Sequence, residues 1–543
     1  MVQSVQMRCV LALACVFALG LQASVGAEFT IRPYVQDVTE QSIVICWESD
    51  VEATAVVRYG RGRPGVELRV QRRATRHEVR IANLEVETSY VYEVVLEGSE
   101  KGVGGSFRTA VRRTSPFVFA VYGDTRGDTM GHAYAVQALV GIKPHLVVHT
   151  GDVVNEASEE DYMGFWRTVN PLDSEWALAS SVPLYPVLGN HDLYYSLKGL
   201  RPDPGYKSPG PQMAMNLWRR FFVLPTNSPQ GVFYEGEPEG YDYSFAERAY
   251  SFRYGVAKFI VLDVNRDDDA KYDVNGQMEP SGAPSYGPGS KQYEWLQGEL
   301  AEAQESSALV FVFLHPSPFS SSQHGRPDDP LLGTPARVLN DLFLRYGVSV
   351  VFSGHDHCYE RSLYRDAQTG VELNYVIAGG GGAPLYGIDD EASANNPYLI
   401  THYGSPLSRE FSVVRVSVEP DAGTPGKWWA VVTAVKVLAN HGEMFDEFRV
   451  AGFDPLFGEV PEPASQAKEP PEPPLPPGME HLPVELQREV QSFEKAFGSS
   501  KGDARYDPQY DLNNDGRVDF RDMAIFSSQF PVPEKKEQLE PQQ

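Results

Sequence analysis

The stretch PFVFAVYGDTR at residues 116–126 decides the fold, because an apolar, β-branched run ends at a glycine followed by a carboxylate. Four other segments repeat this arrangement and place Asp, Asn or His where an apolar run stops. They are HLVVHTGDVVN (145–155), VPLYPVLGNHD (182–192), ALVFVFLHPSPF (308–319) and VSVVFSGHDHCYER (348–361). In an open α/β sheet, ligands gather beyond the carboxyl ends of the strands, so these polar side chains should meet at one crevice. Carboxylate, amide oxygen and imidazole together suit divalent transition metals, so the sequence predicts a metal site there.

Strands and helical stretches alternate around these segments, from about residue 113 to residue 450. HAYAVQALVGI precedes HLVVHTGD, for example, and YEWLQGELAEAQE precedes ALVFVFLHP. This alternation predicts a layered α/β domain of the αββα kind, with central sheets. Residues 410–450 return to strand-like patterning and should close the sheets. Two irregular Gly-, Pro- and Tyr-rich stretches, 200–245 and 270–290, are longer than ordinary connections and should shape substrate access.

The first residues predict export. Arg8 precedes the apolar stretch Cys9–Leu21, and small residues follow at Val25 and Ala27, which is the order found in a secretory signal. We therefore assign residues 1–27 to a signal peptide and expect a secreted protein, extracellular or periplasmic. A membrane anchor is the alternative, but the apolar run is shorter than the ~20 residues that a spanning helix needs. We expect no integral membrane protein.

Residues 28–112 alternate apolar and polar positions in short runs separated by turn residues, which predicts a small all-β sandwich. After removal of the signal peptide two cysteines remain, Cys46 in the apolar run IVICW and Cys358 far from it, so we expect no disulfide framework. The formal net charge of the chain is −26. Such a charge argues against binding to duplex nucleic acid, whose phosphates attract Lys and Arg.

The C-terminal part predicts a tethered calcium module. Residues 451–480 are rich in Pro and Glu and should form an extended spacer. A module at 481–532 follows, with an apolar helical face on each side of the loop DLNNDGRVDFRD, and residues 533–543 should form a disordered tail. In that loop Gly516 stands at the turn, and ligand groups stand at positions 1, 3, 5, 7, 9 and 12 of a calcium loop. They are Asp511, Asn513, Asp515, the backbone carbonyl of Arg517, Asp519 and Asp522.

The twelfth position of this loop is Asp in place of the Glu of an EF-hand, and that choice resembles a dockerin. The resemblance implies a cell-surface or cohesin-like partner. A dockerin carries two such loops, and SSKGDARYDPQY upstream contains no second ligand set. A calcium-stabilised helical cap is therefore the alternative.

The five polar segments, in their order along the chain, resemble the calcineurin-like metallophosphoesterase superfamily. The stretches GHDHCYER, AYSFRYGVAKFIVLD and YVIAGGGGAPLY look most like its purple-acid-phosphatase branch. Trp47 and the pattern LxxxxxYxY at Leu84, Tyr90 and Tyr92 resemble the fibronectin type III module that precedes the catalytic domain in that branch. The resemblance spans residues 28–450 and implies a dinuclear-metal phosphohydrolase that cleaves phosphate monoesters, as an acid phosphatase does.

The resemblance also implies the metal ligands. Asp124 and His357 would hold the first ion, and Asp152 would bridge both. The second ion would have three ligands, which are Asn190, His315 and His355. Independently, His355 and His357 flank one residue and point to the same side at strand spacing, which suits joint ligation. Zinc, iron and manganese remain open as the metals.

Two departures from the branch affect the metals. The branch carries, three residues after the bridging Asp, a Tyr whose phenolate on iron(III) gives the purple colour, and Asn155 stands in that place here. We expect no purple chromophore and treat Asn155 as a further candidate ligand. The first motif is GDTR where the branch has GDxG, so metal identities cannot be copied from the branch.

The implied mechanism is in-line attack on phosphorus by metal-bound hydroxide, since metal ions lower the pKa of bound water. His191 resembles the family histidine that contacts phosphate or protonates the leaving alkoxide, with Asp192 available to orient its ring. Arg126 could bind the phosphate with two hydrogen bonds, and a salt bridge with Asp128 is the alternative. His324, in the loop FSSSQHGRP, stands where the branch often carries a substrate-facing histidine, and a solvated histidine is the alternative.

The motifs fix the metals and leave the substrate open. Phosphodiesters, nucleotides, phytate or phospholipid headgroups are the alternatives to phosphomonoesters. A different class of function, a non-catalytic extracellular binding or adhesion protein, would tolerate loss of metal ligands, and all of them are present.

Overall fold

The computed structural model describes residues 26–457 except 128, 175, 194–209, 233–243, 266–283, 327–333, 406–410 and 438–442. The chain divides into two units, Met1–Gly458 and Glu459–Gln543. The described residues all belong to the first unit. Most of the predicted signal peptide, most of the Pro-rich spacer and the whole calcium module, including Asp511 to Asp522, lie outside the described residues.

The N-terminal region forms strands where the alternating pattern predicts them, and all of them belong to one antiparallel five-stranded sheet, so the predicted sandwich stays a prediction. Its strands are β1 (Phe29–Gln36), β2 (Ile43–Gly60), β3 (Val66–Ile81), β4 (Ser89–Leu96) and β5 (Val103–Arg108). The sheet order is β1-β2-β4-β5, and β3 pairs with β2. The long strand β2 pairs with β1 through its first half and with β4 through its second half, so it links the two parts of the sheet. The fibronectin type III assignment stays a prediction.

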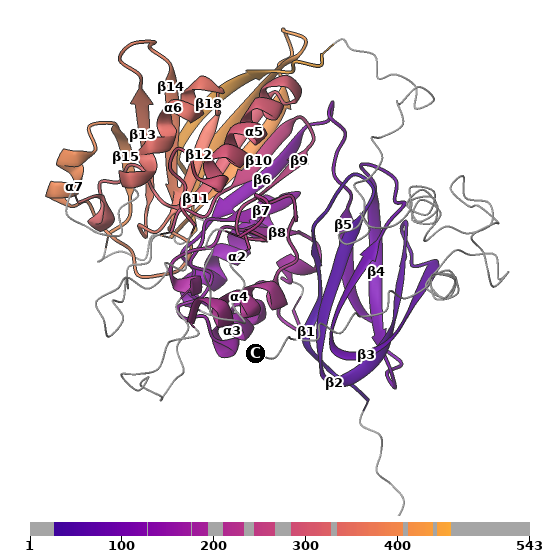
Figure 1. The fold of residues 1–543 in the computed structure, drawn as a ribbon. Helices are drawn as coiled ribbons and strands as arrows, with labels where there is room; N and C mark the ends of the chain where they lie inside the picture. The colour runs from indigo at the N-terminus through magenta and orange to yellow at the C-terminus, as the bar shows by residue number, and fades with distance from the viewer. Residues whose placement is uncertain are drawn as a thin grey trace, which may run out of the picture. The chain divides into compact units, whose positions relative to one another are not determined.

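The following region contains a six-stranded sheet with the order β18-β17-β16-β6-β7-β8. Figure 1 shows β6, β7 and β8 side by side. Its strands are β6 (Phe117–Tyr122), β7 (Leu146–His149), β8 (Leu184–Pro186), β16 (Ser412–Pro420), β17 (Lys427–Lys436) and β18 (Met444–Phe453). The strands β6, β7 and β8 are parallel, and β16 joins β6 in antiparallel register. The C-terminal strands therefore complete the sheet that β6 begins, as expected for residues 410–450.

A second sheet of seven strands has the order β15-β13-β14-β12-β11-β10-β9. Its strands are β9 (Tyr250–Tyr254), β10 (Ala257–Val261), β11 (Leu309–Pro316), β12 (Val350–Gly354), β13 (Tyr359–Arg365), β14 (Glu372–Ala378) and β15 (Leu399–Tyr403). The central strands β10, β11, β12 and β14 are parallel. Their carboxyl ends therefore lie at one edge of the sheet.

Strand β11 shows why this sheet is covered on both faces. Phe311 and Phe313 belong to the core that includes Phe119 of the other sheet, whereas Val310 and Val312 belong to a second core. The second core also contains Leu296 and other apolar residues of α5 and α6. A continuous apolar run is what a strand buried on both faces requires. The layered α/β domain predicted from the sequence is thus present.

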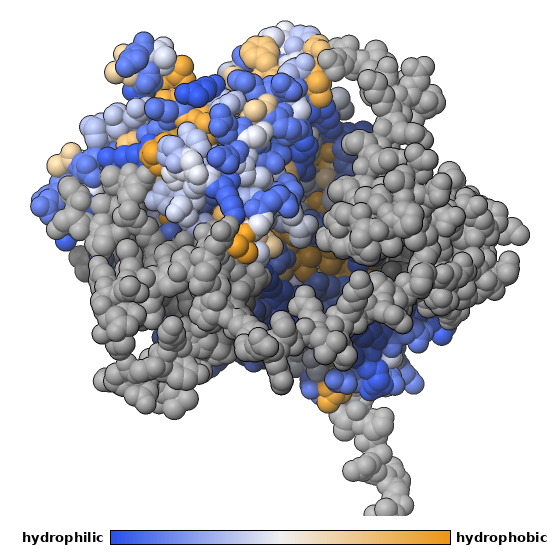
Figure 2. All heavy atoms as spheres, viewed as in Figure 1, coloured by the Kyte–Doolittle hydropathy of each residue, from blue (hydrophilic) through white to orange (hydrophobic). Residues whose placement is uncertain are grey.

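The helices flank these sheets. They are α2 (Met130–Ile142), α3 (Glu159–Val169), α4 (Gly210–Phe221), α5 (Lys291–Ser306), α6 (Asn340–Arg345) and α7 (Asp390–Asn395). Short 3-10 turns are η1 (Leu178–Ser180), η2 (His191–Leu193), η3 (Gln323–Gly325) and η4 (Thr334–Leu339). In the described part of the chain, no helix combines the length and apolarity needed to cross a membrane. Hydrophilic residues predominate on the face shown in Figure 2, as expected for a chain of net charge −26.

Two expectations need correction. The stretch 200–245, expected to be irregular, contains helix α4, and Ala214, Trp218 and Phe221 bury one of its faces at helical spacing. The Gly- and Pro-rich residues before this helix obscured that period in the sequence. Strand β18 continues to Phe453, so the ordered domain extends beyond residue 450.

Candidate metal centre

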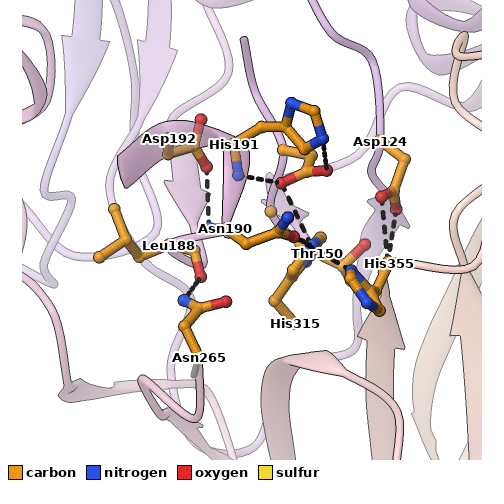
Figure 3. A network of polar contacts seen from close by, with 12 residues as sticks. Asp124, Thr150, Leu188, Asn190, His191, Asp192, Asn265, His315 and His355 are labelled. Atoms are coloured by element: carbon orange, nitrogen blue, oxygen red, sulfur yellow. Dashed lines mark hydrogen bonds and ion pairs between the residues drawn. The ribbon is translucent and has the colours of Figure 1, made fainter. Parts of the chain in front are cut away.

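Six predicted ligands follow strand ends of the two sheets. Asp124 follows β6, Asp152 follows β7 and Asn190 follows β8, while His315 lies near the end of β11. His355 and His357 both follow β12. Figure 3 shows side chains from both sheets meeting at one place. The chain order alone spreads these residues over more than half of the domain, and the strand order brings them together.

The backbone turns sharply where three of these residues stand. Asp124, Asp152 and His355 have positive φ values of 56°, 53° and 72°. Residues other than glycine adopt this left-handed conformation rarely and at a cost in free energy, and such residues cluster at functional sites. In each case the turn ends an apolar strand and places a polar side chain at the shared edge.

The side chains form two groups around Asp152. On one side, Asn190 Oδ1 lies 3.0 Å from His315 Nε2 and 3.0 Å from His355 Nδ1. On the other side, potential ligand atoms of Asp124, Asp152 and His357 all lie within 4.8 Å of one another. Asp152 reaches the first group as well, with Oδ1 3.2 Å from His315 Nε2. This is the division of ligands that the sequence resemblance implies, with Asp152 between two cation positions.

Backbone carbonyls orient two of the imidazoles. His315 Nδ1 donates to the carbonyl of Thr150 at 2.8 Å, and His357 Nδ1 donates to the carbonyl of Pro384 at 2.7 Å. Because a carbonyl can only accept, the proton sits on Nδ1 and leaves the Nε2 lone pair for a cation. Metal-bound histidines are commonly fixed in this way.

Unsatisfied buried atoms support the presence of cations. Asp152 Oδ2, His355 Nε2 and His357 Nε2 are buried and have no hydrogen-bond partner among the described residues. Buried polar atoms in folded proteins are nearly always bonded, and each exception needs an explanation. Oxygen and imidazole nitrogen at this spacing fit transition-metal ions, so the residues present fit the metals that the motifs imply.

The pKa shifts of the buried candidate ligands also fit a site for cations. Burial raises the pKa of Asp124 above its ordinary value, because a buried carboxylate lacks hydration. Burial also lowers the pKa of His355 and lowers that of His357 to about 3, so both imidazoles are neutral. For His315 the burial effect, which lowers the pKa, is outweighed by Asp152 and Asp124, and its pKa rises to about 9, so its Nε2 keeps a proton at neutral pH until a cation displaces it. Each carboxylate here therefore gains from a nearby positive charge.

Arg126 and His191 lie beside Asp152. Arg126 Nη2 donates to His191 Nε2 at 2.7 Å and lies 3.6 Å from Asp152 Oδ2. His191 Nδ1 donates to the carbonyl of Asn155 at 2.7 Å, and the His191 amide donates to Asp152 Oδ1 at 2.9 Å. Arg126 thus reaches the site; its alternative partner, Asp128, lies outside the described residues.

The roles predicted for two residues beside His191 need correction: Asp192 as the group that orients its ring, and Asn155 as a further metal ligand. Asp192 does not orient the His191 ring; its buried carboxylate accepts hydrogen bonds from the amides of Gly189 (2.8 Å) and Val154 (3.2 Å). It therefore fixes the loop that carries Asn190. The ring is held instead by the carbonyl of Asn155, whose side chain is exposed. A short carbonyl contact of this kind leaves no mark in the sequence.

His324 lies against the candidate metal centre. Its ring centroid is 4.1 Å from that of His355, and its amide donates to Asp356 Oδ1 at 3.1 Å. The sequence analysis missed Tyr386, whose ring stacks on His357 at 4.2 Å between centroids. Burial, with smaller effects of charged neighbours, raises the pKa of Tyr386 to about 12. The sequence feature that could have indicated Tyr386 is its place at the end of the stretch YVIAGGGGAPLY.

Gly189 gives a test of the backbone packing around Asp152. A Cβ at Gly189 would lie 2.1 Å from the Asp152 amide nitrogen and 2.3 Å from Asp152 Oδ1. We expect Gly189→Ala to displace the carboxylate and to lower catalytic activity roughly 10²-fold, the typical cost of a shift of about 1 Å in a reacting group. The measurement is kcat/KM of the purified variant together with its metal content.

Gly298→Ala is the matched control. Gly298 lies in helix α5, and a Cβ there would meet no atom within 4 Å. Alanine in a helix is favoured over glycine by up to about 1 kcal/mol, so this variant should keep activity and gain stability. Equal activity of the two variants would show that Gly189 does not determine the position of Asp152.

Residues 117–359 match the protein-family model described as Calcineurin-like phosphoesterase. The chain is 26% identical over 343 residues to the uncharacterized protein Rv2577 of Mycobacterium tuberculosis, covering 56% of this chain and 57% of that protein. It is 25% identical over 333 residues to purple acid phosphatase 15 of Arabidopsis thaliana, covering 56% of this chain and 53% of that protein. The chain thus spans little more than half the length of these relatives.

Among solved structures, the purple acid phosphatase PPD1 from yellow lupin (Lupinus luteus) seeds has a similar fold, with a TM-score of 0.56 and 16% sequence identity. The match covers 77% of this chain and 73% of the lupin chain. Residues 117–359 thus match the calcineurin-like phosphoesterase model, the matched relatives include a purple acid phosphatase, and the fold resembles that of another purple acid phosphatase.

Proposed function

We propose that the calcineurin-like metallophosphoesterase domain of this chain is a dinuclear-metal hydrolase of phosphate monoesters. The observation that carries the proposal is the placement of Asp152 between two groups of candidate ligands, with one carboxylate oxygen buried and without a hydrogen-bond partner. A bridging carboxylate with separate terminal ligands is what two ions about 3.5–4 Å apart require. The names of the relatives support monoesters over diesters as the substrates.

The metal pair, when bound, would supply a nucleophilic water at neutral pH and positive charge beside the phosphoryl oxygens. The residues of the chain do the rest. Asp124, Asp152, Asn190 and the three histidines would hold the ions. Arg126, with its guanidinium 3.6 Å from Asp152 Oδ2, would donate to phosphate oxygens that enter beside it. No protein nucleophile is required.

His191 is the candidate proton donor. Its Nε2 lies 3.9 Å from Asp152 Oδ2 and accepts from Arg126, while Nδ1 is committed to the Asn155 carbonyl. To act as the donor, Nε2 would take up a proton while Arg126 turns to the phosphate. A group near the leaving oxygen gives most help when that oxygen is basic, because a poor leaving group needs its proton in the transition state. His191 would therefore contribute more to alkyl phosphates than to nitrophenyl phosphate.

Hydrolysis of para-nitrophenyl phosphate and bis-para-nitrophenyl phosphate tests the function. We expect the monoester to be cleaved faster, and we expect a chelator to abolish the activity and added zinc, iron or manganese to restore it. Metal analysis of the purified protein should give at least two transition-metal ions per domain. Preference for the diester would make the chain a phosphodiesterase, and inertness toward both esters with every metal would overturn the proposal.

Replacement of His191 separates its chemical role from a structural one. We expect His191→Gln to lower kcat about 10²-fold or more for glycerol phosphate, because the alkoxide loses its acid, and less than about tenfold for para-nitrophenyl phosphate. The measurement is the ratio of the two kcat losses, with the wild-type enzyme as reference. An equal loss for both esters would indicate that His191 acts in binding alone.

We also propose that residues 1–27 direct export and that the loop at 511–522 binds calcium, on the sequence patterns given above. Culture-medium fractionation tests the first proposal. Calcium titration of the full chain against an Asp511→Ala, Asp515→Ala variant tests the second. Binding of a cohesin-like partner by the C-terminal module is a further proposal, which rests on the sequence pattern alone.

A further inference from the structure

A second group of metal-ligand side chains lies outside the candidate metal centre. Potential ligand atoms of Cys358, Glu360 and His402 all lie within 4.8 Å of one another. Cys358 directly precedes β13 and Glu360 is the second residue of that strand, and their ligand atoms lie close together. His402 on β15 pairs directly with Glu360 in the antiparallel register. Two adjacent strands therefore present a thiol, a carboxylate and an imidazole to one point.

Glu360 is buried without a counter-charge. Its side chain is 1% exposed and accepts hydrogen bonds from the Ser321 amide (2.9 and 3.0 Å) and from Asn396 Nδ2 (2.9 Å), which are neutral groups. Among the described ion pairs none includes Glu360. Burial raises its pKa to about 8. Buried carboxylates are normally paired with a cation or bound to a metal. Glu360 has no partner of positive charge among the described ion pairs.

The other two groups offer lone pairs at the same point. Cys358 is fully buried, and its Sγ lies 3.7 Å from the hydroxyl of Ser322. That hydroxyl donates to the Gly387 carbonyl and lies 3.1 Å from His402 Nε2. Ser322 Oγ therefore stands between the thiol and the imidazole. Thiolate, imidazole and carboxylate in a tetrahedral set are the ligands that zinc prefers.

We propose that Cys358, Glu360 and His402 bind one zinc-class ion at a site separate from the candidate metal centre, with Ser322 or a water as the fourth ligand. A tetrahedral ion spaces its ligand atoms roughly 3.3–3.8 Å apart, so atoms that lie up to 4.8 Å from one another need to close by about 1.0–1.5 Å at most. The thiol gives its proton to solvent when the ion binds. The ion ties β13 to β15 and to the segment that carries Ser322.

This site would steady the wall of the candidate metal centre. His324 follows Ser322 by two residues, and its ring lies against that of His355. An ion held by β13 and β15 fixes the segment between Ser322 and His324 without touching substrate. Its loss should therefore affect stability and positioning rather than chemistry.

Cobalt(II) provides the test, since a thiolate bound to cobalt gives a near-ultraviolet charge-transfer band. The six ligands of the candidate metal centre include no sulfur, so the band reports this site alone. We expect the band in the full wild-type chain and in Cys46→Ser, and its loss in Cys358→Ser. Cys46, like Cys358, is a buried free cysteine, and it lies in the N-terminal sheet.

Two further variants keep the proposal testable if Cys358→Ser fails to fold. We expect His402→Gln and Glu360→Gln to need at least tenfold more cobalt than the wild type to develop the charge-transfer band, a signal that the six ligands of the candidate metal centre do not give. Absence of the band in the wild type, or its survival in folded Cys358→Ser, would overturn the proposal. Asp152→Ala should keep the band while losing phosphatase activity, so failure of the proposed function would be seen separately.

Discussion

The variant Asp152→Ala is expected to lose at least about 10³-fold in kcat/KM toward para-nitrophenyl phosphate. Asp152 is the one carboxylate that lies next to both ligand groups, and its removal disrupts both cation positions. A metal ion supplies several kcal/mol of charge stabilisation in the transition state, and each 1.36 kcal/mol corresponds to about a tenfold change in rate. Kinetics and metal content of the same preparation are the measurement.

Asp173→Ala is the control for this prediction, because Asp173 is an exposed aspartate of the same domain. Its kcat/KM and metal content should equal those of the wild type. If Asp152→Ala kept two bound ions and most of its activity, Asp152 could not be a bridging ligand. If the variant lost activity but kept its full metal content, the role of Asp152 would be to orient His191. The backbone amide of His191 donates a hydrogen bond to Asp152 Oδ1 at 2.9 Å.

The sequence predicted the layered domain and the residues that meet at its strand ends because both depend on local signals. An apolar run that stops at a glycine and an aspartate reports a strand end, and the parallel order of β6, β7 and β8 then places these ends together. Helices α2 and α5 follow from their apolar period. None of this depends on the detailed path of the loops.

Contacts made by backbone carbonyls could not be predicted in this way. The carbonyls of Thr150, Pro384 and Asn155 orient three histidines, and every residue type has a carbonyl. Asp192 was assigned to His191 because they are neighbours in sequence, whereas the turn directs its carboxylate to Gly189 and Val154. Where the chain reverses direction, closeness in sequence does not predict which side chains contact each other.

A buried ion pair and a series of hydrogen bonds connect the loop that carries Asn190 to the core. Arg248 Nη1 lies 2.8 Å from Asp263 Oδ2, and these side chains are 2% and 0% exposed. Asp263 Oδ1 also accepts from Asn265 Nδ2 at 3.0 Å. Asn265 Nδ2 in turn donates to the carbonyl of Leu188 at 2.6 Å, two residues before Asn190 (Figure 3).

We expect Asp263→Asn to lower the free energy of unfolding by about 3–5 kcal/mol, because the buried guanidinium of Arg248 would lose the carboxylate charge that pairs with it at 2.8 Å. Burial raises the pKa of Asp263 even though Arg248 acts to lower it, so the desolvation of this carboxylate is large. The measurement is urea-induced unfolding followed by tryptophan fluorescence. The variant should also lose metal affinity, since the Leu188 carbonyl and Asn190 belong to one loop.

A surface pair and a double variant give this prediction its controls. Arg365 and Glu372 also form an ion pair, with side chains 67% and 43% exposed, and Glu372→Gln should cost at most about 1 kcal/mol. Replacing both buried partners, as Arg248→Met with Asp263→Leu, should recover much of the stability that Asp263→Asn loses, because the uncompensated charge is then gone. If the double variant were as unstable as the single one, loss of the hydrogen bonds that Asn265 donates to Asp263, and not the charge of Arg248, would account for the lower stability.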